Sequence, residues 1–279
     1  MTVKRLSPED TEIQLLVEAL RLRHGYDFSQ YAPASLRRRI LALPEQFGVD
    51  SICDLLPRLL HDDRFLPEIL ACLSVPVTEM FRDPPVFQML RELVVPILQT
   101  WPQIRIWQAG AATGEEAYSL AILLHEENLY DRCQIYATDI NDSALSKAEE
   151  GVFPLRLRND YAANYRAAGG KAVFSDYVVE RYGLFRIEDF LRRNIVFSHH
   201  NLVADGVFCE VHLVLCRNVL IYFNHTLQDR VLHLFASALC RNGILCLGPR
   251  ESLRFSEARH VFTPLAPGAC LFRQTGLPS

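Results

Sequence analysis

The pattern that most constrains the fold is an alternation of short apolar runs with amphipathic stretches, which begins at Ile104. The runs have strand character, and the stretches repeat apolar residues every three to four positions. Such alternation is typical of a mostly parallel sheet covered by helices, in a doubly wound α/β arrangement. The expected strands are 104–108, 134–138, 195–198, 212–216, 244–248 and 269–273, and the expected helices are 115–127, 142–150 and 226–241.

The first part of the chain has only the helical period, as in the pairs Leu16/Leu20 and Leu55/Leu59. We therefore expect a small all-helical domain over residues 1–85 and an α/β domain over residues 86–279. Two domains suit a chain of 279 residues. A helix is expected from about residue 84 to 100, before Trp101-Pro102 breaks it. Residues 154–193 interrupt the alternation and predict an inserted subdomain.

Composition excludes several classes of protein. Hydrophobic residues make up 49% of the chain and charged residues 22%, as in ordinary globular proteins. A net charge of −4 argues against a nucleic-acid-binding surface. The N-terminus lacks the apolar core of a signal peptide, and no apolar run is long enough to span a membrane. We expect a cytoplasmic protein without membrane insertion, with reduced core cysteines and no metal site, because the cysteines form no CxxC pair and the histidines are scattered.

Small residues from Gly110 to Gly114 join the first expected strand to the next helix. They permit close approach of the backbone to a ligand, although tight packing is the other interpretation. Glu115 and Glu116 follow at the helix N-terminus, where they would repel a bound pyrophosphate. A ligand with a positive centre fits better. S-adenosylmethionine, with its sulfonium and ammonium groups, meets that demand.

Later strands also end in residues suited to ligand binding. Asp139 follows the second strand, where an acid of a Rossmann-like sheet can accept both ribose hydroxyls. A helix cap is the alternative, but Asn141, Asp142 or Ser143 could supply that cap. Arg217 interrupts an apolar run, and a buried charge is costly unless it is partnered. The candidates at the later strand ends are Asn201, Leu202, Arg217 and Asn218.

Five segments occur in the order and approximate spacing of a known family. They are Val-Thr-Glu-Met-Phe-Arg (77–82), Ala-Thr-Gly-Glu-Glu-Ala-Tyr-Ser (112–119), Ala-Thr-Asp-Ile (137–140), Asn-Leu (201–202) and Cys-Arg-Asn-Val-Leu-Ile-Tyr-Phe (216–223). With them the chain resembles the chemotaxis receptor glutamate methyltransferases, the CheR family, from about Gly25 to Phe272. The resemblance implies a helical N-terminal domain and a Rossmann-like methyltransferase domain with a small inserted β-subdomain. It also implies S-adenosylmethionine as methyl donor, S-adenosylhomocysteine as product, and methyl esters formed on glutamates of chemoreceptor cytoplasmic helical domains.

The resemblance also implies roles for single residues. Thr78 and Arg82 would contact the cofactor, and Arg82 and Tyr222 are the catalytic candidates, Tyr222 lying near the reacting carboxylate. Glu116, or its neighbour Glu115, would face the methionine or sulfonium side. In the same way, Asp139 would bind the ribose, and Asn201, Leu202, Arg217 and Asn218 would line the adenine and methionyl pocket.

The chain departs from the family pattern in three places. Pro76 stands where relatives often carry Asn, and Gly248-Pro249-Arg250-Glu251 replaces a Gly-His-Ser-Glu-like stretch. The insertion 154–193 is also untypical, so the receptor is expected to be unusual.

Docking on acidic receptor helices is expected to use Arg37, Arg38 and Arg39, although a solvated helix face is the simpler interpretation. We expect a monomer. A non-catalytic module that senses S-adenosylmethionine or a nucleotide stays open as an alternative. A nucleobase methyltransferase would carry Asp/Asn-Pro-Pro-aromatic after its fourth strand, whereas Asp83-Pro84-Pro85-Val86 precedes the sheet and lacks the aromatic residue.

Overall fold

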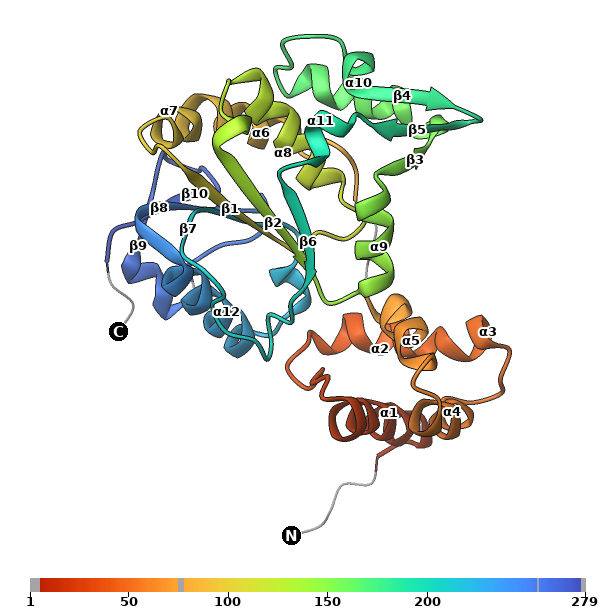
Figure 1. Ribbon diagram of the computed structural model, residues 1–279. Helices are drawn as coiled ribbons and strands as arrows, with labels where there is room; N and C mark the ends of the chain where they lie inside the picture. The colour runs from red at the N-terminus through yellow and green to blue at the C-terminus, as the bar shows by residue number, and fades with distance from the viewer. Residues whose placement is uncertain (1–5, 75–77, 255, 277–279) are drawn as a thin grey trace. The chain divides into compact units, whose positions relative to one another are not determined.

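A computed structural model describes residues 6–74, 78–254 and 256–276 (Figure 1). The chain forms two compact units, Met1–Val75 with Ile221–Leu227, and Pro76–Leu220 with Gln228–Ser279. The division therefore comes before the expected border at residue 85. The short segment Ile221–Leu227, from the later part of the chain, groups with the N-terminal unit. Pro76, one of the departures from the family pattern, lies outside the described residues.

The helices in the first segment of the N-terminal unit lie between Pro8 and Leu73. Helix α1 begins after Ser7, whose hydroxyl accepts a hydrogen bond from the Asp10 N–H (3.1 Å), and ends at Gly25, which has a left-handed φ of 78°. Prolines open α1 and α2, where a missing N–H costs nothing. The helices are α1 (Pro8–His24), α2 (Pro33–Leu41), α3 (Leu43–Phe47), α4 (Leu56–His61) and α5 (Phe65–Leu73). They enclose a core of their own that includes Leu16, Leu20, Ile40, Leu59 and Phe65.

The second unit is built on a seven-stranded sheet in the order β6-β2-β1-β7-β8-β10-β9. Its strands are β1 (Ile104–Ala109), β2 (Cys133–Asp139), β6 (Ile195–His199), β7 (Val211–Cys216), β8 (Leu239–Leu247), β9 (Phe262–Pro264) and β10 (Leu271–Gln274). The first five strands in that order pair in parallel. Strand β10 pairs antiparallel with β8 on one side and with β9 on the other. The predicted α/β sheet is thus confirmed. The carboxyl ends of β6, β2, β1 and β7 meet at one edge, where such sheets bind ligands.

Helices cover both faces of this sheet (Figure 1). Helices α6 (Pro84–Met89), α7 (Val95–Leu98) and α8 (Glu115–Glu126) lie on one face, and α12 (His225–Ala238) lies on the other. A π-helical turn, Leu90–Val94, joins α6 to α7, next to Pro96, which has no N–H to continue the ladder. Helix α12 ends earlier than expected because β8 begins at Leu239, and the short β9 was not expected.

The insertion follows α9 (Asp142–Glu150) and contains a three-stranded antiparallel sheet in the order β3-β5-β4. Its elements are β3 (Val152–Pro154), α10 (Arg158–Ala167), β4 (Val178–Arg181), β5 (Leu184–Ile187) and α11 (Asp189–Arg192). Phe153, Tyr161 and Phe185 join the same hydrophobic core as the large sheet. The predicted inserted β-subdomain is therefore present and packs as part of the second unit.

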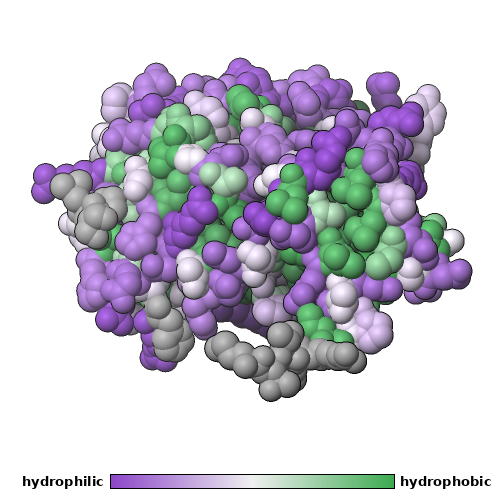
Figure 2. Space-filling view, turned by 90° about the horizontal axis from the view of Figure 1, so that it is seen from below, coloured by the Kyte–Doolittle hydropathy of each residue, from purple (hydrophilic) through white to green (hydrophobic). Residues whose placement is uncertain are grey.

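The surface drawn in Figure 2 is hydrophilic over most of its area, with hydrophobic side chains exposed in small groups. Exposed apolar residues of the N-terminal unit include Leu6, Leu15 and Leu22. Among the helices of the described residues, none is long and apolar enough to cross a membrane.

Candidate functional site

The turn that follows β1 has a conformation that depends on glycine at two positions. Gly110 and Gly114 have φ angles of 84° and 93°. A Cβ at Gly110 would lie 2.4 Å from a Val219 methyl carbon, and a Cβ at Gly114 would lie 2.9 Å from the Ala148 Cβ. The turn is therefore closely packed against Val219 and Ala148. Tight packing and ligand binding, which the sequence left as alternatives, are compatible here.

Asp139 connects this turn to the end of β2. Its Oδ2 accepts a hydrogen bond from the Ala112 N–H (2.8 Å), and its Oδ1 accepts one from the Asn141 N–H (3.0 Å). Burial raises the pKa of Asp139, and these backbone hydrogen bonds oppose the rise. Asn141 is the cap of α9, because its side chain accepts from the Ala144 N–H. The helix-cap role is thus already filled, and the Asp139 carboxylate, which offers about four acceptor sites, can accept a further hydrogen bond.

Two buried side-chain oxygens at this edge of the sheet have no hydrogen-bond partner among the described residues. Glu116, in the first turn of α8, accepts from Arg217 Nη1 (2.8 Å) with Oε2, but its Oε1 is unpartnered. Gln108, at the end of β1, donates to the Gly110 carbonyl (3.2 Å), and its Oε1 is also unpartnered. Burial raises the pKa of Glu116, and the ion pair with Arg217 opposes the rise. A buried acceptor without a donor is costly, so both oxygens call for a ligand that donates hydrogen bonds or carries positive charge.

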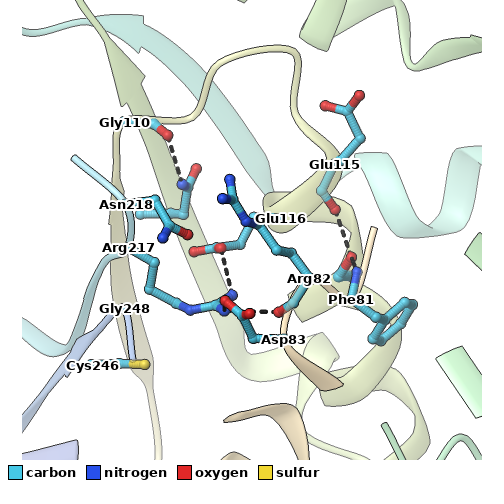
Figure 3. Close-up of polar contacts among 12 residues, drawn as sticks. Phe81, Arg82, Asp83, Gly110, Glu115, Glu116, Arg217, Asn218, Cys246 and Gly248 are labelled. Carbon is cyan, nitrogen blue, oxygen red and sulfur yellow. Dashed lines mark hydrogen bonds and ion pairs between the residues drawn. The ribbon is translucent and has the colours of Figure 1, made fainter. Parts of the chain in front are cut away.

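Arg217 has no solvent-exposed side-chain surface. Its Nη2 donates to the Arg82 carbonyl (2.7 Å) and to Asp83 Oδ2 (2.8 Å), in addition to the Glu116 contact (Figure 3). Its guanidinium carbon lies 5.5 Å from the centre of the Phe87 ring. The structure therefore places Arg217, predicted as a pocket residue, in a buried network that joins β7, α8 and the loop before α6.

The loop that carries Arg82 is held in an unfavourable backbone conformation. Phe81 and Asp83 have φ angles of 53° and 54°, and each left-handed non-glycine residue costs about 1–2 kcal/mol. The Phe81 N–H donates to Ser119 Oγ (2.9 Å), and that hydroxyl donates to the Glu115 carbonyl (2.6 Å). Ser119 and Arg217 therefore fix the loop from two sides. In Figure 3 the Arg82 side chain extends from this loop toward Glu116.

Glu115 is buried beside Glu116 but has different partners. The Thr113 hydroxyl donates to its Oε2 (2.6 Å), and the Tyr161 hydroxyl lies 3.4 Å from its Oε1. Burial raises the pKa of Glu115, whereas both hydroxyls lower it. Tyr161 comes from α10 of the insertion, so the insertion reaches the same helix N-terminus. The sequence analysis assigned no role to Tyr161.

Glu251 is a second residue that the sequence analysis missed. Its Oε2 accepts hydrogen bonds from the N–H groups of Asn218 (3.0 Å) and Gly248 (2.7 Å). Asn218 has a left-handed φ of 61° just after β7. Glu251 therefore holds the strand end at which Asn218 lies. It belongs to the Gly-Pro-Arg-Glu stretch, and the glutamate that this stretch keeps could have indicated its role.

The remaining candidates are less closely gathered. Asn201 forms a turn after β6, where its Oδ1 accepts from the Val203 N–H (2.9 Å), and Leu202 is buried next to it. Thr78 is half-buried at the start of the second unit. Tyr222 belongs to the other unit, where its carbonyl accepts from the Ala32 N–H (2.7 Å).

The three consecutive arginines of α2 differ in their surroundings. Arg37 forms ion pairs with Glu9 and Asp10. Arg39 donates to the Ser35 hydroxyl (3.0 Å) and lies 4.5 Å from the centre of the Tyr222 ring. Arg38 is exposed.

Two family models match the chain. The model described as CheR methyltransferase, SAM binding domain, matches residues 76–266, and CheR methyltransferase, all-alpha domain, matches residues 11–74. The boundary between the two models agrees with the division of the structure into units.

Several curated proteins are similar over most of the chain. The protein Cher3 of Pseudomonas putida is 47% identical over 266 residues, which cover 95% of this chain and 97% of that protein. Chemotaxis protein methyltransferase 2 of Pseudomonas aeruginosa is 33% identical over 68% of this chain and 67% of its own length. A chemotaxis protein methyltransferase of Listeria innocua is 27% identical over 82% of this chain and 85% of its own length.

Proposed function

Because this chain belongs to the CheR methyltransferase family, we propose that it methylates glutamate side chains of chemoreceptor-like proteins, with S-adenosylmethionine as the methyl donor and a methyl ester as the product. The names of its relatives, chemotaxis protein methyltransferases, support this substrate class. The observation that carries the proposal is the pair of unpartnered buried oxygens of Gln108 and Glu116, which suit a cationic ligand.

In this proposal the methyl donor binds along the polar edge of the sheet. The methionyl side of the donor is bound by Gln108, Glu115 and Glu116, because buried acceptors and carboxylates favour positive charge. Asp139 takes the ribose hydroxyls. Asn201, Leu202 and Asn218 line the rest of the pocket, together with Thr78 and Arg82. Arg217 holds Glu116 and the Arg82 loop rather than the ligand.

The reaction needs little acid or base chemistry from the protein. A glutamate side chain has an unperturbed pKa of about 4.3, so near neutral pH it is already an anionic nucleophile. A carboxylate oxygen attacks the methyl carbon while the carbon–sulfur bond breaks and leaves its electron pair on sulfur. No proton moves in this step, so the main task of the site is alignment, which can supply roughly 7–11 kcal/mol. We propose that Arg82 orients the substrate carboxylate and that Tyr222 lies near that carboxylate.

Receptor docking is proposed to involve α2. Methylated receptor helices are rich in acidic residues, and Arg38 is the exposed member of the arginine group. Arg37 and Arg39 contribute if their present partners release them.

The direct test is transfer of a tritiated methyl group to receptor cytoplasmic fragments, followed by base treatment, which releases methanol from an ester. The intact chain should give base-labile label, and Glu116→Gln should weaken both transfer and calorimetric binding of S-adenosylhomocysteine. Label that resists base would exclude a glutamate ester. Binding without any transfer to a panel of receptors would favour the non-catalytic sensing module instead.

A further inference from the structure

We propose that Tyr161 and Asn164, on helix α10 of the insertion, are positioning residues that set the geometry of the methyl-donor site. The inference rests on the proposed function, because it assigns Glu115 and the Arg82 loop to that site. It adds a role for the insertion that is internal to the active site.

The first contact runs from α10 to α8. The Tyr161 hydroxyl lies 3.4 Å from Glu115 Oε1, and the Tyr161 side chain is only 2% exposed. Thr113 occupies the other carboxylate oxygen at 2.6 Å. The Glu115 carboxylate is thus oriented by one hydroxyl from its own turn and one from the insertion. If the Tyr161 hydroxyl is removed, that carboxylate loses one of its two side-chain donors.

The second contact comes from the same face of α10, because residues three positions apart lie side by side on a helix. Asn164 Nδ2 donates to the Met80 carbonyl (3.1 Å). Met80 is fully buried and immediately precedes Phe81, the first left-handed residue of the Arg82 loop. One helical face therefore supports both sides of the site, the acidic helix N-terminus and the loop that carries Arg82.

Helix α10 is itself fixed by the small sheet of the insertion. The Tyr161 ring makes edge-on contacts with Phe153 of β3 (6.4 Å between ring centres) and Phe185 of β5 (6.1 Å). Both rings are buried. A displacement of the three-stranded sheet would therefore move the Tyr161 hydroxyl relative to Glu115.

The charges around this contact determine its pH dependence. The Tyr161 hydroxyl is influenced by three charged side chains. They are Glu115 of α8, Glu79, which lies just before the Arg82 loop, and Arg156 of the turn before α10. Burial and the two acids raise the pKa of Tyr161, so the hydroxyl stays protonated and can donate. Its hydrogen bond lowers the pKa of Glu115. Without that bond, Glu115 gains its proton at a higher pH and the site loses negative charge there.

The test is calorimetric titration of the full chain with S-adenosylhomocysteine across a range of pH, with Tyr161→Phe compared with Tyr182→Phe. Tyr182 lies in the hairpin of the same insertion and is 98% exposed. Tyr161→Phe should bind about two- to tenfold more weakly, the range expected for one hydrogen bond. The loss of affinity as the pH falls should also begin at a higher pH. Tyr182→Phe should keep the wild-type profile.

A second variant keeps the inference falsifiable if Tyr161→Phe fails to fold. Asn164→Ala should lower kcat for methyl transfer more than it raises KM for the donor, because it loosens the loop that carries Arg82. Coincident pH profiles for Tyr161→Phe and Tyr182→Phe, or an unchanged kcat in Asn164→Ala, would overturn the inference. A wild-type chain that does not bind the ligand would instead refute the proposed function.

Discussion

At the scale of single residues, Arg217 has the most demanding surroundings. A guanidinium without exposed surface is stable only when its acceptors are in place, and Glu116, Asp83 and the Arg82 carbonyl provide three of them at 2.7–2.8 Å. Lysine keeps the charge but cannot reproduce this planar arrangement of donors. The position therefore requires the geometry of arginine as well as its charge.

We predict that Arg217→Ala destabilises the fold by about 3–5 kcal/mol, because it leaves Glu116 buried without its partner. Arg217→Lys should fold but lose methyl transfer and donor affinity together. Urea denaturation and the methyl-transfer assay measure the two effects. Arg241→Lys, at an exposed position, is the matched control and should change neither. Wild-type turnover in Arg217→Lys would contradict the positioning role.

The sequence predicted some of these residues better than others. A local pattern predicted the glycine turn, Glu115, Glu116 and Asp139 as site residues. This was possible because the end of a strand and the start of the next helix are adjacent in the chain. Two acceptors of Arg217, the Arg82 carbonyl and Asp83, come from a loop before the sheet, and local patterns carry no signal for such long-range pairing. Gln108 was missed for the same reason, since a polar residue at a strand end shows its role only through its neighbours in space.

At the scale of elements, the insertion is attached to the large sheet through Glu126 at the end of α8. This carboxylate accepts from the Tyr177 hydroxyl (2.9 Å) and the Lys171 N–H (2.9 Å), and also from Tyr165 and Arg91. Its side chain is only 4% exposed. These donors lower the pKa of Glu126 in the folded protein, although burial opposes them.

A lowered folded-state pKa gives the stability a definite pH dependence. The contribution of Glu126 is fully present above its unfolded-state pKa and is lost as the pH falls through the folded value. We predict that Glu126→Gln lowers the free energy of unfolding by roughly 3 kcal/mol near neutral pH. The difference from the wild type should shrink in acid. Urea denaturation at several pH values measures it, and a difference that does not vary with pH would show that Glu126 acts through packing alone.

The elements themselves were predictable where the periodicity was strong. Strands β1, β2, β6 and β7 and helices α8 and α9 lie close to their expected positions. The boundary between α12 and β8 was not predictable, because Leu239-Cys240 continues the apolar character of the helix and Arg241-Asn242-Gly243 separates it from the apolar run that begins at Ile244. Likewise, β9 has only three residues, and it exists because β10 offers it a pairing edge.

At the scale of the whole molecule, each of the two compact units packs a hydrophobic core of its own, and the N-terminal unit recruits a distant segment. Ile221–Leu227 groups with the N-terminal unit. The Asn224 N–H donates to the Gln30 carbonyl (2.8 Å), and the rings of Phe223 and Tyr31 meet edge-on at 5.1 Å. A domain boundary drawn along the sequence, as at residue 85, cannot represent such an exchange.

We predict that this segment unfolds with the N-terminal helices. Leu20→Ala removes a fully buried side chain of that core and should cost about 2–5 kcal/mol. Hydrogen exchange should then quicken in α1, α2 and residues 221–227, and stay slow in β1. Leu124→Ala, at a fully buried position of the other core, should not quicken exchange in α1 and α2. Unchanged exchange at Asn224 in Leu20→Ala would contradict this grouping.

The insertion presents two surfaces that tolerate substitution to different degrees. The tip of its hairpin turns at Tyr182 and Gly183, and Tyr182 is 98% exposed. A substitution of the Tyr182 side chain therefore disturbs little packing. Tyr161 and Asn164 face inward, and their contacts leave no such freedom. The exposed tip can therefore change its chemistry while α10 keeps its contacts with Glu115 and with the Met80 carbonyl.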